Sequence, residues 1–277
     1  MGICKYCGED AGFLRKKHKE CERKYLEGKN AVIDIIHNAF ISKNITNMVN
    51  NIKEICDSSY IKDFDKKLFI STGWEKSIDT AFEDDLVSEE EENLLCDILE
   101  KFSLTQYDVN NNGYYTKLIK GTVIRTLING EIPNKITIEG NLPFNFQKNE
   151  SLIWIFQNVD YIEQKTKTHY VGCSSGFSIR IAKGVYYRTG AFKGERIQTE
   201  QSLYADTGIL AITNKNLYFG GSRKNFRINF NKIVSFIPYS DGLGVHKDGV
   251  SAKPQTFITG DGWFIYNLVS NISNLNQ

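Results

Sequence analysis

Three cysteines and one histidine within the first 21 residues constrain this chain more than any other feature. Cys4 and Cys7 are separated by two residues and precede Gly8, so both thiolates can face one metal ion while the glycine adopts a positive φ. After ten intervening residues, His18 and Cys21 lie three positions apart, which places both side chains on one face of a helix. The spacing therefore predicts a zinc ion bound by Cys4, Cys7, His18 and Cys21.

Residues 13–27 are rich in strong helix formers and are expected to be helical. A knuckle followed by a ligand-bearing helix resembles short treble-clef-like zinc fingers with a Cys3His site, and residues 1–28 form this predicted finger. A closed set of four ligands favours one structural Zn²⁺ over a catalytic ion, which keeps an open position for water. The basic residues around the finger are interspersed with acidic ones, so contact with nucleic acid, contact with protein and simple stabilisation of the N-terminus all stay open.

The other cysteines and the hydropathy pattern indicate a cellular compartment. The sequence shows no signal-peptide pattern and no apolar run near the ~20 residues that a membrane span needs. We therefore expect a cytoplasmic protein without a transmembrane segment, whose thiols stay reduced. In that setting Cys56, Cys96 and Cys173 are interpreted as small core residues.

Charge is distributed unevenly along the 277 residues. The net charge is only +1, which argues against a strong general attraction to polyanions. Residues 51–100 nevertheless contain 15 acidic and 5 basic residues, and residues 165–227 contain 11 basic and 3 acidic ones. These blocks predict two faces of opposite potential, or two ordinary solvated faces. The length favours two or three domains.

Residues 29–135 have the periodicity of a helical domain. Apolar residues recur at helical spacing over 31–40, 48–56, 73–82 and 88–102, and residues 28–30 are the only expected break from the finger helix. Ser88 followed by Glu91 predicts a capping box. A last helix is expected over 114–128, ended by Asn129 and Gly130.

Two acidic segments of this domain are candidates for metal binding. The turn around residues 81–91 resembles the acidic turn between paired helices in TerB-like domains, which implies Glu83, Asp84, Asp85 and Glu91 as ligands; a solvated capping turn is the alternative. Asp108 to Gly113 matches the first half of an EF-hand loop, but the twelfth position is Ile119 instead of glutamate. An Asn/Gly loop between helices is therefore preferred there.

Beyond Pro143 the sequence changes to short β-forming runs that end in one helix. Strands are expected at 151–159, 168–173, 177–182, 185–189, 208–213, 217–220, 226–230, 233–239, 243–246 and 255–259, with a helix over the final residues that buries Trp263, Leu268 and Ile272. The run from Gly208 to Gly221 resembles the central hairpin of GRAM and bacterial pleckstrin-homology-like (PH-like) domains. The resemblance implies a PH-like β-barrel or sandwich over 145–277, capped by the C-terminal helix. The expected fold class is thus α+β multidomain.

One β-hairpin of this region combines basic residues with aromatic ones and glycines. The candidate ligand-binding residues are Arg180, Lys183, Arg188, Lys193 and Arg196. Such a hairpin can contact the phosphates of an anionic lipid or of nucleic acid, or can have an ordinary charged outer face.

No recognisable catalytic motif accompanies these features. Phosphate-binding loops, nucleotide fingerprints and the H-E-x-x-H pattern are absent from the sequence. We therefore expect a non-enzymatic adaptor whose modules bind a protein partner or an anionic ligand. The alternatives are a nucleic-acid-binding protein that uses the finger together with the basic segment 180–196, and a module recruited to anionic membranes.

Overall fold

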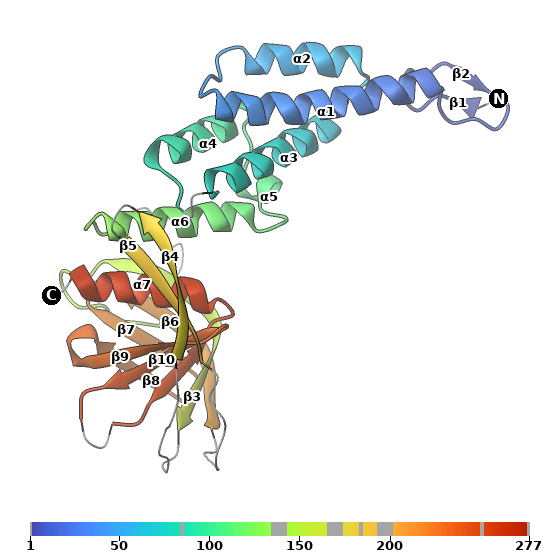
Figure 1. Ribbon diagram of the computed structural model, residues 1–277. Coiled ribbons are helices and arrows are strands. Elements are labelled where there is room, and N and C mark those ends of the chain that lie inside the picture. Colours follow the sequence, from blue (N-terminus) through green and yellow to red (C-terminus); the bar gives the residue numbers. More distant parts are fainter. Residues whose placement is uncertain are drawn as a thin grey trace. The chain divides into compact units, whose positions relative to one another are not determined.

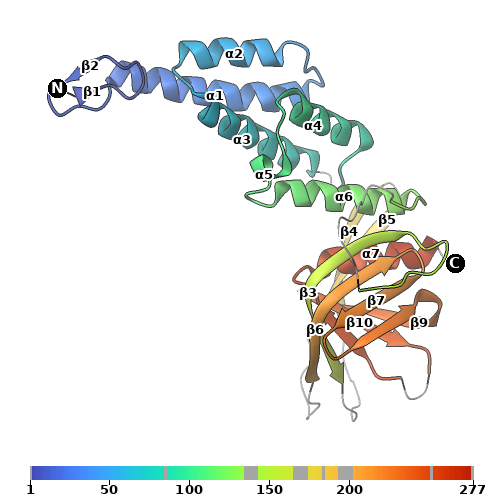
Figure 2. The same ribbon diagram turned by 180° about the vertical axis from the view of Figure 1, so that it is seen from behind.

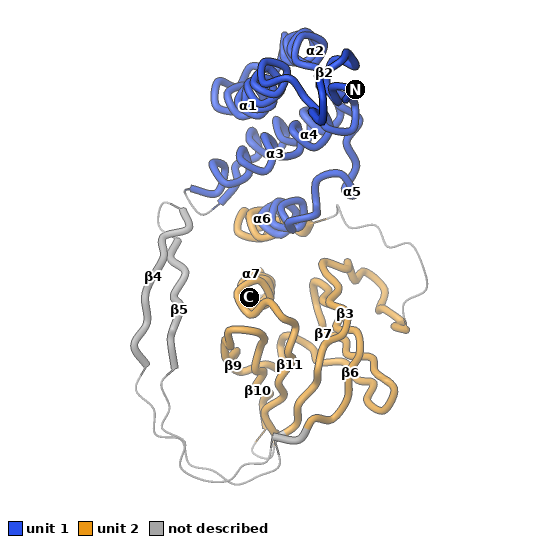
Figure 3. Tube along the Cα trace, turned by 90° about the vertical axis from the view of Figure 1, so that its right-hand side faces the viewer, with its two compact units in different colours: residues 1–122 blue, residues 123–277 orange. Residues whose placement is uncertain are grey.

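The computed structural model describes residues 2–83, 86–133, 143–164, 174–182, 185–192, 202–249 and 252–275. The chain is a mixed α/β protein that divides into two compact units, residues 1–122 and 123–277 (Figure 3). We describe each unit by itself. The strand predicted at 168–173 lies outside the described residues.

The first unit begins with a small two-stranded sheet and continues as helices (Figure 1). The sheet pairs β1 (Gly2–Ile3) with β2 (Asp10–Gly12). The helices that follow are α1 (Lys19–Ile41), α2 (Met48–Ser58), α3 (Asp63–Ala81), α4 (Glu89–Lys101), α5 (Gln106–Val109) and α6 (Tyr114–Ile128), and the boundary between the units falls within α6.

Helix α1 differs from its predicted bounds. It begins at Lys19, six residues later than expected, and passes through residues 28–30 without a break. Gly28 is buried inside this helix, where an added Cβ would overlap the side chain of Ser59. The glycine therefore permits a close approach of the chain instead of ending the helix.

The core of the first unit is apolar and centres on Trp74. This side chain is fully buried, and its indole Nε1 donates a hydrogen bond to the Leu95 carbonyl at 3.0 Å. The predicted stripe on α1 is confirmed by the burial of Val32 and Ile36. Cys56 is also buried as expected, whereas Cys96 is exposed on α4 and is not a core residue; Cys173 lies outside the described residues.

Local signals at helix ends behave as predicted. Ser88 caps α4, and its hydroxyl accepts from the Glu91 N–H while the Glu91 carboxylate accepts from the Ser88 N–H. Helix α6 ends at Ile128, before Gly130 at a φ of 85°. Both caps are determined by residues within one turn, which explains why they are readable from sequence.

The second unit contains an antiparallel seven-stranded sheet and the C-terminal helix (Figure 2). Its strands are β3 (Leu152–Gln164), β6 (Ser202–Thr213), β7 (Asn216–Gly221), β8 (Asn225–Asn229), β9 (Ile233–Pro238), β10 (Gly242–Lys247) and β11 (Gln255–Ile258), and a 3₁₀ turn at Phe230–Lys232 precedes β9. The order across the sheet is β8-β7-β6-β3-β11-β10-β9. Within the described ranges no strand pair joins the edge strands β8 and β9, so the closed form of the predicted barrel is not found.

A separate hairpin pairs β4 (Ser174–Ala182) with β5 (Val185–Phe192). Both strands lie within the segment that connects β3 to β6, and they are not part of the seven-stranded sheet.

The hairpin β6–β7 matches its prediction closely. Ile212 pairs with Leu217 and Leu210 with Phe219, and these four side chains are buried. Asn214 and Lys215 form the connection. Alternation of inward and outward residues therefore sets the register of this hairpin, as the pattern indicated.

Helix α7 (Gly262–Leu275) covers the sheet through Phe264, whose ring lies 4.7 Å from the ring of Trp154 on β3. Leu268 and Ile272 are buried as predicted. Trp263, however, is 41% exposed, so its assignment to the core was wrong. The buried face runs along 264, 265, 268, 269 and 272, and position 263 lies on the opposite side of the helix.

Candidate metal centre

The first two candidate ligands lie on a tight turn between β1 and β2. The Gly8 N–H donates to the Cys4 carbonyl at 2.9 Å, and the Cys4 N–H donates to the Glu9 carbonyl at 2.8 Å. Gly8 has a φ of 81°, the left-handed value expected from the sequence. These bonds direct both thiols toward the inside of the turn.

The other two ligands come from the beginning of α1. His18 is the N-cap residue with an extended backbone, and Cys21 lies in the first turn. His18 thus precedes the helix instead of belonging to it, but the separation of three residues still brings both side chains to the same place.

The four ligand atoms of Cys4, Cys7, His18 and Cys21 lie within 4.8 Å of one another. His18 Nδ1 is 3.4 Å from Cys7 Sγ and 3.6 Å from Cys21 Sγ. In a tetrahedral zinc site with ordinary bond lengths, a sulfur and a nitrogen ligand are separated by about 3.6 Å. The donor set and its spacing are therefore compatible with a zinc ion, and no other group of this kind is found among the described residues.

The imidazole of His18 is oriented for metal binding through Nδ1. Its Nε2 lies 3.0 Å from the backbone carbonyl of Asp10, to which an Nε2–H donates. A proton on Nε2 leaves the lone pair of Nδ1 free to face the three sulfurs. Asp10 makes this contact through its backbone carbonyl, so the type of its side chain could not predict the contact.

The thiols differ in their protonation chemistry in the metal-free protein. Burial raises the pKa of Cys4, but the backbone N–H groups of Cys7, His18 and Tyr6 outweigh this effect and lower it to about 6. Burial, together with the neighbouring Cys7 thiol, raises the pKa of Cys21 to about 11. Of these two thiols, Cys4 is therefore the one more readily available to a cation as a thiolate, and a bound cation would favour deprotonation of Cys21.

The centre has a small core that also contacts the helices. Cys4, Ala11 and Cys21 are buried, and Tyr60, from the connection between α2 and α3, packs against them. Tyr6 continues the contact through Tyr25, whose ring centroid lies 4.9 Å away. The finger is thus packed on the helical unit. Tyr60 could not be predicted as a contributor from sequence, since it lies far from the ligands in the chain.

The other predicted acidic sites do not form a comparable centre in the described residues. The Glu91 carboxylate is engaged in the capping box. Glu83 belongs to the described residues, whereas Asp84 and Asp85 lie outside them. In the EF-hand-like segment, Asp108 accepts from the Thr105 N–H at 2.7 Å and so caps α5. This contact agrees with the loop interpretation.

The basic candidates are only partly described. Arg180 pairs with Tyr186, and Arg188 with Ser178, in the backbone register of the β4–β5 hairpin. Lys183, Lys193 and Arg196 lie outside the described residues. The hairpin itself is therefore observed, but the ligand-binding role of these five residues stays a prediction.

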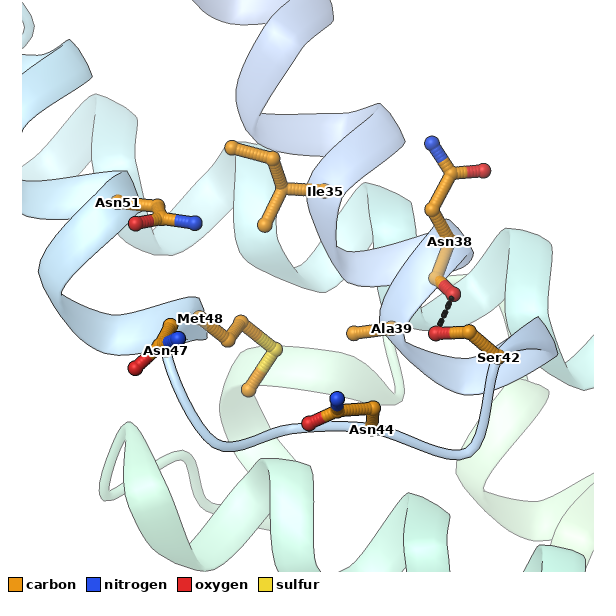
Figure 4. A pocket seen from close by; sticks show the side chains of 8 residues that line it. All are labelled: Ile35, Asn38, Ala39, Ser42, Asn44, Asn47, Met48 and Asn51. Carbon is orange, nitrogen blue, oxygen red and sulfur yellow. Dashed lines mark hydrogen bonds between the residues drawn. The ribbon is translucent and has the colours of Figure 1, made fainter.

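A surface cavity of about 350 Å³ lies between the end of α1 and the beginning of α2 (Figure 4). It is lined by Ile35, Asn38, Ala39, Ser42, Asn44, Asn47, Met48 and Asn51. The Ser42 hydroxyl donates to the Asn38 carbonyl at 2.7 Å. None of the lining side chains ionises near neutral pH, so this cavity offers no acid–base pair.

Comparison with known proteins adds no assignment. No family model, no curated protein and no solved structure matches this chain. Among the described residues, every helix is too short or too polar to cross a membrane.

Proposed function

We propose that this chain is a non-enzymatic binding protein, an adaptor whose N-terminal finger is held together by one structural zinc ion. The observation that carries this proposal is the closed set of four ligand atoms within 4.8 Å. Three thiols and one imidazole fill a tetrahedral shell, which leaves no position for water or substrate. The ion would therefore stabilise the finger and would not take part in a reaction.

A PH-like fold of the sheet unit is the second part of the proposal. Two observations support it. The strands β3, β6, β7 and β8 follow one another across the sheet, and β9, β10 and β11 return to the other side of β3 before α7. The hairpin with the GRAM-like motif lies in the first of these series. In this order the last strand, β11, pairs with the first, β3, and a helix follows.

The function that follows is recruitment of a protein partner or an anionic ligand by the sheet unit. Such units provide surfaces and not catalytic groups, and joining them in one chain raises the effective concentration at the second site. Nucleic-acid binding by the finger and the basic segment 180–196, and membrane recruitment by the same segment, are the alternatives. We do not extend the proposal to a TerB-like identity of the helical unit or to a metal at its acidic turn.

Affinity purification of the tagged full-length protein from its native cells tests the adaptor proposal. The expected result is a protein that stays bound through a high-salt wash and, once purified, binds the full chain in a calorimetric titration. Retention of nucleic acid alone, removed by nuclease or salt, would instead favour the nucleic-acid alternative. Turnover of a small molecule by the purified protein would contradict a non-enzymatic role.

A further inference from the structure

The finger carries two adjacent large apolar side chains that are almost completely exposed. Phe13 is 84% exposed and Leu14 is 85% exposed. They follow β2 and occupy the loop of residues 12–17, which we call the tip loop. Exposed apolar area on this scale is unfavourable in water and is typical of surfaces that contact an apolar partner.

The tip loop is attached to the metal centre at both ends. Gly12, with a φ of 90°, ends β2, and its N–H donates to the Asp10 carboxylate at 2.9 Å. At the other end, the Lys16 carbonyl accepts from the Lys5 N–H at 2.9 Å. His18, one of the four candidate ligands, lies two positions after Lys16. A folded metal centre therefore presents Phe13 and Leu14 in a defined position.

One residue of the tip loop has a backbone conformation that is uncommon for residues other than glycine. Leu14 has a φ of 58°, a left-handed value that is unfavourable for a residue with a Cβ. The Arg15 N–H returns to the Gly12 carbonyl at 3.4 Å, which closes the turn around Phe13 and Leu14. The two side chains thus lie on a narrow projecting turn and not on the floor of a groove.

Positive charge accompanies the apolar pair. Arg15 and Lys16 are exposed, and within the described residues neither forms an ion pair with an acidic side chain. The neighbouring acidic side chains of α1 are engaged by other cations: Glu22 by Lys17, and Glu20 and Glu27 by Arg23. The charged side chains within residues 12–17 are therefore all basic, while the exposed carboxylates of Glu9 and Asp10 lie just before the loop.

We propose that the tip loop docks on an anionic lipid bilayer. Phe13 and Leu14 would enter the boundary between headgroups and acyl chains, while Arg15 and Lys16 would contact lipid phosphates. A bilayer accepts a projecting apolar turn without a matching pocket, and its negative surface attracts juxtaposed basic residues. A leucine offers no stacking surface to nucleic-acid bases, which favours the bilayer over a single strand. The inference goes beyond the adaptor function and does not require it.

Vesicle sedimentation of the zinc-loaded full-length protein tests this inference. The probes are vesicles of phosphatidylcholine with phosphatidylserine and vesicles of phosphatidylcholine alone. The double variant Phe13→Ala/Leu14→Ala should bind the anionic vesicles at least about tenfold more weakly than the wild type. Arg15→Gln and Lys16→Gln should each weaken binding about fivefold. Because all four side chains are exposed, zinc content and thermal unfolding should not change.

Phe64→Ala is the matched control. Phe64 is 82% exposed on α3 but is directly flanked by Asp63 and Asp65. Its removal deletes comparable apolar area in acidic surroundings and should leave vesicle binding unchanged. A second readout uses Phe13→Trp, whose fluorescence should shift to the blue and be quenched by brominated acyl chains.

The vesicle and fluorescence results either support or overturn docking of the tip loop on a bilayer. Binding that is lost in the Phe13→Ala/Leu14→Ala variant and kept in Phe64→Ala supports it. Absence of wild-type binding to anionic vesicles, or equal binding by the double variant, overturns it. Binding of the tip loop to nucleic acid or to a purified protein, without quenching of the Phe13→Trp variant by brominated lipid, also overturns it.

Discussion

Glu150 lies just before β3 and connects the entry segment of the sheet unit to the β6–β7 hairpin. Its Oε1 accepts from the Thr213 hydroxyl at 2.7 Å and from Asn216 Nδ2 at 2.5 Å. Its Oε2 accepts from the Tyr218 hydroxyl at 2.7 Å and from the Gln147 N–H at 2.6 Å. Glu150 precedes the strand predicted at 151–159, and these contacts assign a structural role to it.

The substitution Glu150→Ala removes every one of these acceptors. The Thr213 hydroxyl can still donate to the Asn216 carbonyl, 3.1 Å away. The side chain of Asn216 is fully buried, and loss of an acceptor for such a donor costs about 1–3 kcal/mol. The bond from Tyr218 adds a similar amount, reduced because Glu150 is only half-buried and water can enter. The expected loss of unfolding free energy is about 2–4 kcal/mol.

Denaturant unfolding followed by tryptophan fluorescence measures this loss, since Trp154 and Trp263 both belong to the sheet unit. The corresponding fall in melting temperature is about 6–15 °C. Glu131→Ala is the control, because that glutamate is exposed and should give wild-type stability. If Glu150→Ala unfolds within about 0.5 kcal/mol of the control, the carboxylate does not hold the hairpin.

The same carboxylate predicts an acid dependence. Burial raises the pKa of Glu150, but the bonds from Asn216, Thr213 and Tyr218 outweigh it and lower the pKa below its ordinary value of 4.5. A lowered native pKa contributes stability that is complete above the unfolded pKa and is lost as pH falls through the native pKa. The difference between wild type and Glu150→Ala should therefore narrow below about pH 4.

Three further substitutions test other contacts. Gly28→Ala should destabilise the helical unit by about 1–2 kcal/mol in denaturant unfolding, although alanine is the better helix former, because its Cβ overlaps Ser59; a more stable variant would contradict the packing argument. Trp74→Phe should cost about 2–3 kcal/mol through a cavity and the lost bond to Leu95, and an unchanged midpoint would refute this. Asp206→Asn should weaken the β7–β8 turn at neutral pH, since the N–H groups of Arg223 and Lys224 lower the pKa of Asp206 to about 2 despite its burial. The stability that the ionised Asp206 contributes is complete above its unfolded pKa and is lost as pH falls toward 2. The acid-unfolding curves of variant and wild type should therefore converge near pH 2; curves that diverge would contradict this.

Features that depend on neighbouring residues in the chain were predictable. The capping box of Ser88 and Glu91 and the end of α6 before Gly130 require only local hydrogen bonds. The register of β6 and β7 follows from alternating apolar residues around Asn214 and Lys215. The metal ligands belong to the same class, because all four lie within 18 consecutive residues.

Features that depend on distant residues were not predictable. Gly28 resembles a helix break until Ser59 is known to pack against it. The error at Trp263 is of another kind, because helical spacing places this residue on the polar side of α7 with Asn267 and Ser270, opposite the stripe that contains Phe264. The exposed pair in the tip loop belongs to a segment that sequence analysis expected to be helical, and only the late start of α1 reveals it.

X-ray absorption at the zinc edge, combined with metal analysis of the purified full-length protein, tests whether the four ligands hold a zinc ion. We expect one zinc ion per chain, with three sulfur ligands at about 2.3 Å and one nitrogen ligand at about 2.0 Å. Cys96→Ser, an exposed cysteine outside the finger, should leave this shell intact, whereas Cys21→Ser should remove one sulfur. A metal-free protein, or a shell with a coordinated water in the wild type, would contradict a closed structural site at Cys4, Cys7, His18 and Cys21.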